Sequence, residues 1–339
     1  MSSEIRINGV GAVSAAGWSA AALADACAAG AALPTELLER VVNGATITSE
    51  VRRVPAAGPE DVPKFPRLRR ASPITRFAMA AAVQAVGPAL TAAVQAGERT
   101  LGVVATMMNG CVNYSNRFYA EVLADPSLAS PLIFPETVFN APASHISAYF
   151  GSRAVSHSLL GDSANFLTGV EMAAEWLLDG RVDACLVVGC EELDWLVAEG
   201  LGLYGRGLAA SEGAAAVLLE RGGSGPLIER ITAPSGFANG RMAAAAAVRA
   251  ALAADPAADM LVDSCTGVRW ADAGEADVWG DWSGRRLSPR RVLGEPLGAS
   301  AALQTVVAVA ALQAGAARRA LVASTGGNQQ ALGMALLGC

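Results

Sequence analysis

The stretch PLGASAALQTVVAVAALQAGAA, residues 296–317, contains no charged side chain. It is as long as the roughly 20 apolar residues that a membrane-spanning helix needs. Its composition argues against contact with lipid, because alanine dominates and glycine, serine, threonine and glutamine interrupt it, whereas lipid-facing helices favour leucine, isoleucine, valine and phenylalanine. We therefore expect a helix that protein encloses on every side, in a chain that does not contact the membrane.

The composition of the whole chain is that of a large, apolar, globular protein. Of its 339 residues, 53% are hydrophobic and 17% are charged, and the mean hydropathy is +0.37. Globular domains carry roughly 25% charged residues, so little of this chain is polar surface. The length predicts two domains or one large layered unit, and the composition excludes a disordered chain, a disulfide-rich miniprotein and a coiled coil.

Charge and cysteine content narrow the class of partner. The net charge is −6 and the pI is near 5.1, which excludes a general nucleic-acid binder. The six cysteines show no paired spacing and the N-terminal residues no secretory pattern, so we expect reduced thiols in a cytoplasmic protein. The only histidines are His145 and His157, and no metal site is expected.

The order of predicted elements repeats along the chain. A strand, a helix and a strand are predicted at 154–158, 163–178 and 184–189, and again at 260–264, 298–313 and 320–324. This repetition indicates two duplicated α/β halves, residues 1–222 and 223–339, joined near the RGGSG stretch at 221–225. A charge-free helix in the second half fits a five-layer αβαβα sandwich, in which central helices lie between two sheets. Residues 37–61 are predicted to be mostly loop, and 109–140 to be a functional or interface loop.

Five stretches carry a resemblance to a known family. They are INGVGAVSAAG (7–17), RRASPITRFAMAAA (69–82), FPETVFNAPASHISAYFGS (134–152), GRVDACLVVGCEE (180–192) and SEGAAAVLLE (211–220). With them, the chain resembles the β-ketoacyl-acyl-carrier-protein synthases, or ketosynthases, of the thiolase fold. The resemblance extends over nearly the whole chain, but the stretch from 192 to 211 is much shorter than in that family. That segment normally carries part of the acyl pocket and its gating loop.

The catalytic positions of that family hold other residues here. SCTGVRWADAGE (264–275) resembles the family stretch HGTGTxxxDxxE, with Ser264 in place of the histidine. RRVLGEPLGASA (290–301) resembles KSxxGHxxGAAG, with Glu295 in place of the second histidine. The nucleophilic cysteine would fall at Leu160 or Gly161. Condensation needs an activated thiolate and two imidazoles, so the resemblance implies that this chain does not condense acyl groups alone.

Ketosynthase-like subunits without the nucleophile are known as chain-length factors. Resemblance to them implies a heterodimer with an active ketosynthase, in which the silent subunit shapes the acyl tunnel of type II polyketide, polyene or aryl-polyene synthesis. It implies no cofactor, because the acyl chain arrives on a phosphopantetheinyl acyl carrier protein. The candidate tunnel and interface residues are Met107, Met108, Asn109, Phe134, Phe139 and His157. The candidate residues for docking the carrier protein are Lys64, Arg67, Arg69 and Arg70.

Two alternatives stay open on the sequence. Ser163, assisted by Asp162, is a possible replacement nucleophile of an acyltransferase or hydrolase, although both residue types also favour the N-cap of a helix. A homodimeric acyl-binding scaffold is the other alternative. Asp272 and Glu275 are interpreted as acids that fix a loop, and Glu295 as an acceptor for Ser264 or Arg290.

Overall fold

The structure is a computed structural model that describes residues 4–252 and 258–338. Its main sheet has 11 strands. The first half of this sheet consists of β1 (Ile5–Val13), β4 (Leu101–Met107), β5 (Ser156–Leu160), β6 (Ala184–Glu191) and β8 (Gly213–Arg221). The second half consists of β9 (Leu227–Ile231), β11 (Met260–Val262), β12 (Arg285–Leu287), β13 (Arg319–Thr325) and β14 (Gln330–Leu337), with β10 (Ser235–Gly236) paired to β14.

The two halves of the sheet have the same strand order. Across the first half the order is β5-β4-β6-β8-β1, and across the second it is β12-β11-β13-β14-β9. If the strands of each half are numbered 1 to 5 in chain order, leaving out the short β10, both halves have the order 3-2-4-5-1. In both halves the three strands at the free edge of the sheet are parallel, and the pairs nearer the junction of the halves are antiparallel. The halves meet where β1 pairs with β9, at Arg6 and Leu227. The predicted duplicated α/β architecture is therefore confirmed.

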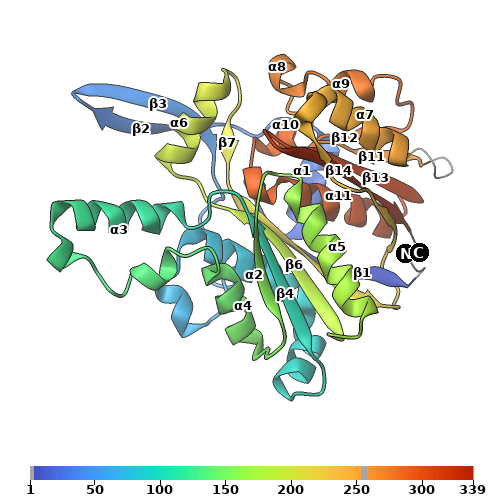
Figure 1. The fold of residues 1–339 in the computed structure, drawn as a ribbon, viewed down its shortest axis with the longest axis horizontal. Helices are drawn as coiled ribbons and strands as arrows, with labels where there is room; N and C mark the ends of the chain where they lie inside the picture. The colour runs from blue at the N-terminus through green and yellow to red at the C-terminus, as the bar shows by residue number, and fades with distance from the viewer. Residues whose placement is uncertain (1–3, 253–257, 339) are drawn as a thin grey trace.

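Helices form three layers around the two half-sheets (Figure 1). In the middle layer, α5 (Asn165–Leu178) and α11 (Ser300–Gln313) share one hydrophobic cluster with α1 (Ala20–Ala29) and with strands of both halves. On the outer face of the first half lie α2 (Pro73–Gln95) and α4 (Ala141–Phe150). The outer face of the second half is covered by α7 (Arg241–Leu252) and α9 (Glu275–Val278). This is the predicted five-layer sandwich.

The charge-free stretch 296–317 is a central helix, as predicted. It forms a short 3-10 turn, η5 (Leu297–Ala299), followed by α11, and α11 contacts strands of both half-sheets. All residues from Ser300 to Val309 are buried. Small side chains allow this close approach, because alanine leaves room for two sheets to pack on one helix.

A different helix has the length and hydropathy of a membrane span. Among the described helices, only α2 is long and apolar enough to cross a bilayer, by length and composition alone. Its buried residues pack against the first half-sheet in a hydrophobic core cluster, and Gly87 (φ +69°) followed by Pro88 kinks it. A core helix of a globular protein passes the same test. From the sequence we did not expect this helix to have the length and hydropathy of a membrane span.

Three segments differ from the sequence expectations. Within residues 37–61, β2 (Glu36–Val42) and β3 (Ala45–Arg52) form a hairpin, and β3 also pairs with β7 (Ala210–Ser211). Residues 109–140 contain the helix α3 (Val112–Ala124) and two 3-10 turns, η2 (Pro126–Leu128) and η3 (Phe134–Glu136). The shortened stretch after residue 192 forms α6 (Trp195–Tyr204), beside the hairpin (Figure 1). The remaining short elements are η1 (Pro66–Arg70), η4 (Phe237–Asn239), α8 (Arg269–Asp272) and α10 (Pro289–Leu293).

Candidate functional site

The three positions at which the resemblance predicts replaced catalytic residues lie in different environments. Leu160 ends the edge strand β5, and its side chain is 51% exposed. Ser264 follows β11 and Glu295 follows α10, and both are buried. A leucine offers no group that can carry an acyl chain, so the position of the nucleophile is chemically inert.

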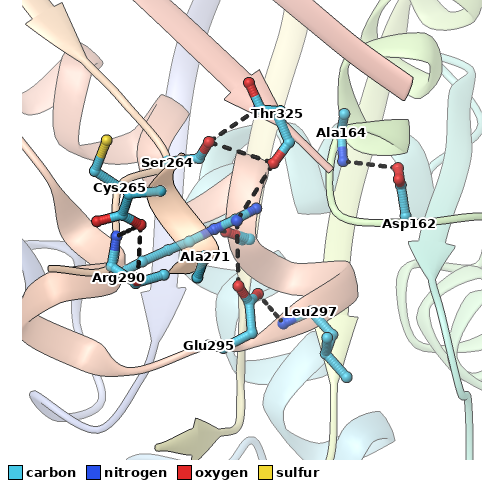
Figure 2. Close-up of polar contacts among 12 residues, drawn as sticks. Asp162, Ala164, Ser264, Cys265, Ala271, Arg290, Glu295, Leu297 and Thr325 are labelled. Carbon is cyan, nitrogen blue, oxygen red and sulfur yellow. Dashed lines mark hydrogen bonds and ion pairs between the residues drawn. The ribbon is translucent and has the colours of Figure 1, made fainter. Parts of the chain in front are cut away.

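Ser264 is fixed by a buried hydrogen-bond network (Figure 2). Its Oγ donates to a carboxylate oxygen of Glu275 and its backbone N–H donates to the other, at 3.0 Å. The Thr325 N–H donates to the same Oγ at 2.9 Å. Because the single hydroxyl proton points to Glu275, Ser264 has no donor left to polarise a substrate carbonyl. Burial raises the pKa of Glu275, and the nearby Asp263 raises it further.

Glu295 forms a buried ion pair instead of an electrophilic site. Arg290 Nη1 lies 3.1 Å from one carboxylate oxygen, and the Leu297 N–H donates to the other at 2.9 Å (Figure 2). Arg290 Nε donates to the Ser300 hydroxyl. Burial raises the pKa of Glu295, and Arg290 opposes that rise. Of the two predicted donors to Glu295, the structure has Arg290 and not Ser264.

Acidic side chains hold the surrounding loops, as predicted for Asp272 and Glu275. The Asp272 carboxylate accepts from the backbone N–H groups of Thr266 and Gly267, both at 2.7 Å. The sequence analysis missed a further acid of this kind. Glu191, at the end of β6, accepts from the backbone of Met108, Asn109 and Gly298, at 2.9, 2.9 and 3.1 Å. Burial raises the pKa of Glu191 to about 7, against the effect of these hydrogen bonds.

The turn at Asp162 and Ser163 differs from the N-cap interpretation. Helix α5 begins at Asn165, with Ala164 as its N-cap, so Ser163 does not cap it. The Asp162 carboxylate accepts instead from Ala164 N–H at 3.4 Å (Figure 2) and from Gln329 N–H at 2.9 Å. It thereby ties the start of α5 to the loop before β14. Both side chains are buried, and within the described residues no hydrogen bond joins the Asp162 carboxylate to the Ser163 hydroxyl.

A small cavity of about 90 Å³ lies among these residues. Ser163, Arg290 and Glu295 contribute polar atoms to its lining. Neither a histidine nor a cysteine is among the lining residues, so the cavity brings no imidazole to Ser163 and no thiol to the vacated site. The sequence analysis did not anticipate several of the other lining residues, which are Leu201, Tyr204, Leu208, Arg241 and Trp270.

The candidate tunnel and interface residues do not converge in one cavity. Met107 is buried in β4 and registers with Leu160 of β5, whereas Met108 lines the small cavity. Asn109 is half-buried beside Glu191. Phe134 and Phe139 are exposed on the segment after α3, and His157 is exposed on the edge strand β5. Most of these residues therefore lie on or near one surface rather than around a common interior space.

The candidate docking arginines line a groove. Arg67, Arg69 and Arg70 lie in or beside η1, across a space of about 600 Å³ from Pro135 and His145. Lys64 lies outside this groove and pairs with Glu60 at 3.3 Å, with both side chains exposed. An exposed pair of this kind adds little stability.

Comparison with known proteins identifies the relatives of this arrangement. Residues 59–203 match the family model described as Beta-ketoacyl synthase, N-terminal domain. No curated protein sequence matches the chain. The family match confirms the resemblance to ketosynthases that the motifs predicted.

Solved structures match the chain over almost its whole length. The ishigamide ketosynthase/chain length factor matches with a TM-score of 0.81 and 18% identity, covering 99% of this chain and 100% of that one. The complex of the ketosynthase ApeO with its chain length factor ApeC, from Xenorhabdus doucetiae, matches with a TM-score of 0.80 and 16% identity. This match covers 99% of this chain and 98% of that one. A third match is AntDE:AntF, a type II polyketide synthase acyl-carrier protein in complex with its ketosynthase bound to the hexaketide. Its TM-score is 0.78 and its identity 14%, and the match covers 100% of both chains. These matches establish the thiolase-like ketosynthase fold.

Proposed function

We propose that this chain, which has the thiolase-like ketosynthase fold and resembles β-ketoacyl synthases over residues 59–203, is a catalytically silent subunit of the chain-length-factor type. It pairs with an active ketosynthase and shapes the acyl tunnel in type II polyketide, polyene or aryl-polyene biosynthesis. The observation that carries this proposal is the replacement of all three catalytic groups, by Leu160, Ser264 and Glu295.

The local chemistry supports a silent site rather than a weak one. Leu160 cannot be acylated, and Ser264 commits its proton to Glu275. An ionised Glu295, paired with Arg290, has no proton with which to replace the hydrogen bond that a histidine would donate to the thioester carbonyl. Loss of any one group is severe for a catalytic unit whose members act together, and here all three differ.

The edge strand β5 supports a paired molecule. β5 ends the path of the sheet, so one side of it has no strand partner among the described residues. An unpaired edge invites another strand. In ketosynthase dimers, which this chain resembles, the corresponding strands pair across the twofold axis. Exposed apolar side chains on β5 and on residues 132–139 are suited to the same interface, and they are Leu132, Phe134, Val138, Phe139 and Leu160.

The small internal cavity supports a division of labour between subunits. A space of about 90 Å³ is smaller than the roughly 150 Å³ that holds one benzene molecule, so it cannot house a growing polyketide. The growing chain would therefore run along the interface and in the partner, with Met107, Phe134 and Phe139 nearby. The carrier protein would deliver it in the cytoplasm, and the groove with Arg67, Arg69 and Arg70 has the charge to receive an acidic carrier.

Co-expression with a ketosynthase that retains the Cys-His-His set tests the proposal. We expect the two full chains to copurify and to elute as one heterodimer, and the length of the product to change when this subunit is exchanged for another. Mass spectrometry after exposure to acyl thioesters provides the second readout. We expect no adduct on Ser163, which no imidazole accompanies in its cavity. A stable monomer or homodimer that leaves product length unchanged, or an acyl group on Ser163, would contradict the proposal.

A further inference from the structure

Two neighbouring cavities meet at Arg290 and Glu295. The first is the space of about 90 Å³ described above. The second, of about 220 Å³, lies on the other side of the same wall and is lined by Arg52 and Arg291. Leu208, Thr266, Arg290 and Glu295 line both cavities. We refer to these two adjoining cavities, the narrow one and the wider one, as the joint site.

The charge of this joint site is strongly positive. Arg52, Arg241, Arg290 and Arg291 line it, and Glu295 is the only acidic residue among the lining residues of either cavity. The ion pair with Arg290 already balances Glu295. Three arginines therefore remain without a counter-ion in the lining, and such a surface attracts an anion.

In two of the lining arginines, one guanidinium nitrogen has no hydrogen-bond acceptor among the described residues. Arg290 is 4% exposed, and its Nη2 has no hydrogen-bond partner in the part of the chain that the structure describes. The Nε of Arg241 is likewise buried without a partner among those residues, although its Nη1 donates to the Ala271 carbonyl at 2.9 Å. Buried charged donors without acceptors are costly and uncommon in native proteins. They indicate an acceptor that the protein chain itself does not supply.

The remaining walls of the narrow cavity are apolar. Leu201 and Tyr204 from α6 face it together with Trp270 from α8. The Trp270 indole N–H donates to the Arg206 carbonyl at 2.7 Å, which holds the indole against the loop that follows α6. Such walls disfavour a fully hydrated ion such as phosphate and favour a ligand with a hydrocarbon part.

We propose that this joint site binds a short-chain monocarboxylate, with its carboxylate near Arg290 and Arg241 and its hydrocarbon tail against Leu201, Tyr204 and Trp270. A carboxylate has two acceptor oxygens that match the fork of a guanidinium. The narrow cavity has about two-thirds of the volume that holds benzene, so a tail of about four carbons fits. This goes beyond the proposed function, because it gives the silent subunit a small ligand of its own that it does not condense.

Titration calorimetry of the full chain with butanoate tests the proposal. We expect saturable binding of one butanoate per chain, and much weaker binding of butan-1-ol, which has the same tail without the charge. R290Q and R241Q should each weaken butanoate binding about tenfold or more, as expected for the loss of a charge-assisted hydrogen bond. R318Q removes an exposed arginine that lines neither cavity, and it should bind like the unchanged chain.

Several results would overturn this assignment. They are an absence of butanoate binding at ~10 mM, equal binding of butan-1-ol, or unchanged affinity in R241Q. The R241Q result is decisive even if R290Q does not fold, because the Arg241 side chain is half-buried and forms no ion pair with Glu295. Melting by circular dichroism identifies which variants are folded. Decanoate serves as a size control, because a tail of that length exceeds the narrow cavity and should bind more weakly than butanoate.

Discussion

At the scale of single residues, the vacated catalytic site is filled with a charged pair rather than left open. Glu295 and Arg290 are both buried and lie 3.1 Å apart. A buried ion pair contributes little net stability by itself, but removing one partner leaves the other charge uncompensated. The pair therefore resists change even though it performs no chemistry.

The substitution Glu295→Gln tests this pair. We expect it to lower the free energy of unfolding by about 3 kcal/mol, because Arg290 would remain buried without its counter-ion. Urea denaturation provides the measurement. Glu60→Gln is the matched control, since Glu60 pairs with Lys64 at 3.3 Å with both side chains exposed, and it should cost less than about 1 kcal/mol. Equal losses of unfolding free energy in the two variants would contradict the expectation that breaking the buried pair costs more than breaking an exposed one.

At this scale the motifs predicted Ser264 and Glu295 in place of the two catalytic histidines, which stays a prediction. Of the two partners predicted for Glu295, the structure has Arg290. The pairing of Ser264 with Glu275 was not predicted, because the spacing of 11 residues passes through a loop whose path no periodicity reveals. Arg241 was missed because it belongs to α7, which carries no family motif, and Trp270 because it stands at a variable position of the motif at 264–275.

At the scale of elements, the exposed end of β5 is the feature with the clearest consequence. Leu160 stands beside an unpaired strand edge and close in sequence to the buried start of α5. An exposed leucine at a sheet edge indicates an interface more strongly than one on an isolated helix, because both main-chain groups and the side chain can be covered together.

Leu160→Asp tests the role of β5 in assembly. We expect it to weaken the heterodimer at least tenfold while the isolated chain stays folded, since burying an unpaired carboxylate in an interface is costly. Analytical ultracentrifugation of the co-expressed subunits gives the dissociation constant. Leu203→Asp on α6 is the control, because Leu203 is 89% exposed and belongs to a helix that packs against β2, β3 and β7. A heterodimer unaffected by Leu160→Asp would place the interface elsewhere.

Elements with regular periodicity were predicted well, and those set by turns were not. The central helix at 296–317 was foreseen because an absence of charge over its length permits only burial. The β2–β3 hairpin was taken for loop, although Asn43-Gly44 between two strands is a strong hairpin signal. Both residues have positive φ, at 52° and 80°, as that two-residue turn requires.

At the scale of the whole molecule, Glu191 links the two halves. It ends β6 of the first half and accepts from Gly298 at the start of the central helix of the second half. The unfolded chain would release this proton near the ordinary value of 4.5, whereas the folded chain retains it until the pKa of about 7. Between these values the folded state binds more protons, so stability falls as the pH rises.

The pH dependence of unfolding tests this linkage. We expect the free energy of unfolding to decrease from pH 5 to pH 8, with Glu191 accounting for as much as about 3 kcal/mol of the change. In Glu191→Gln that part of the slope disappears, and the variant should also be less stable at pH 5, because an amide group cannot accept all three backbone N–H groups. Chemical denaturation across the pH range gives both quantities. An identical slope in the variant would contradict the assignment of the proton to Glu191.

The register of the strands at the junction of the two halves has a consequence for engineering. Leu227 of β9 registers with Arg6 of β1 on one side and with Leu337 of β14 on the other. The first and last strands are thus separated by one strand, or about 10 Å. A linker of a few residues would join them, and new ends could be opened at the Asn43-Gly44 turn, which joins β2 to β3 at the tip of their hairpin. A circularly permuted chain made in this way would keep every strand neighbour of the original.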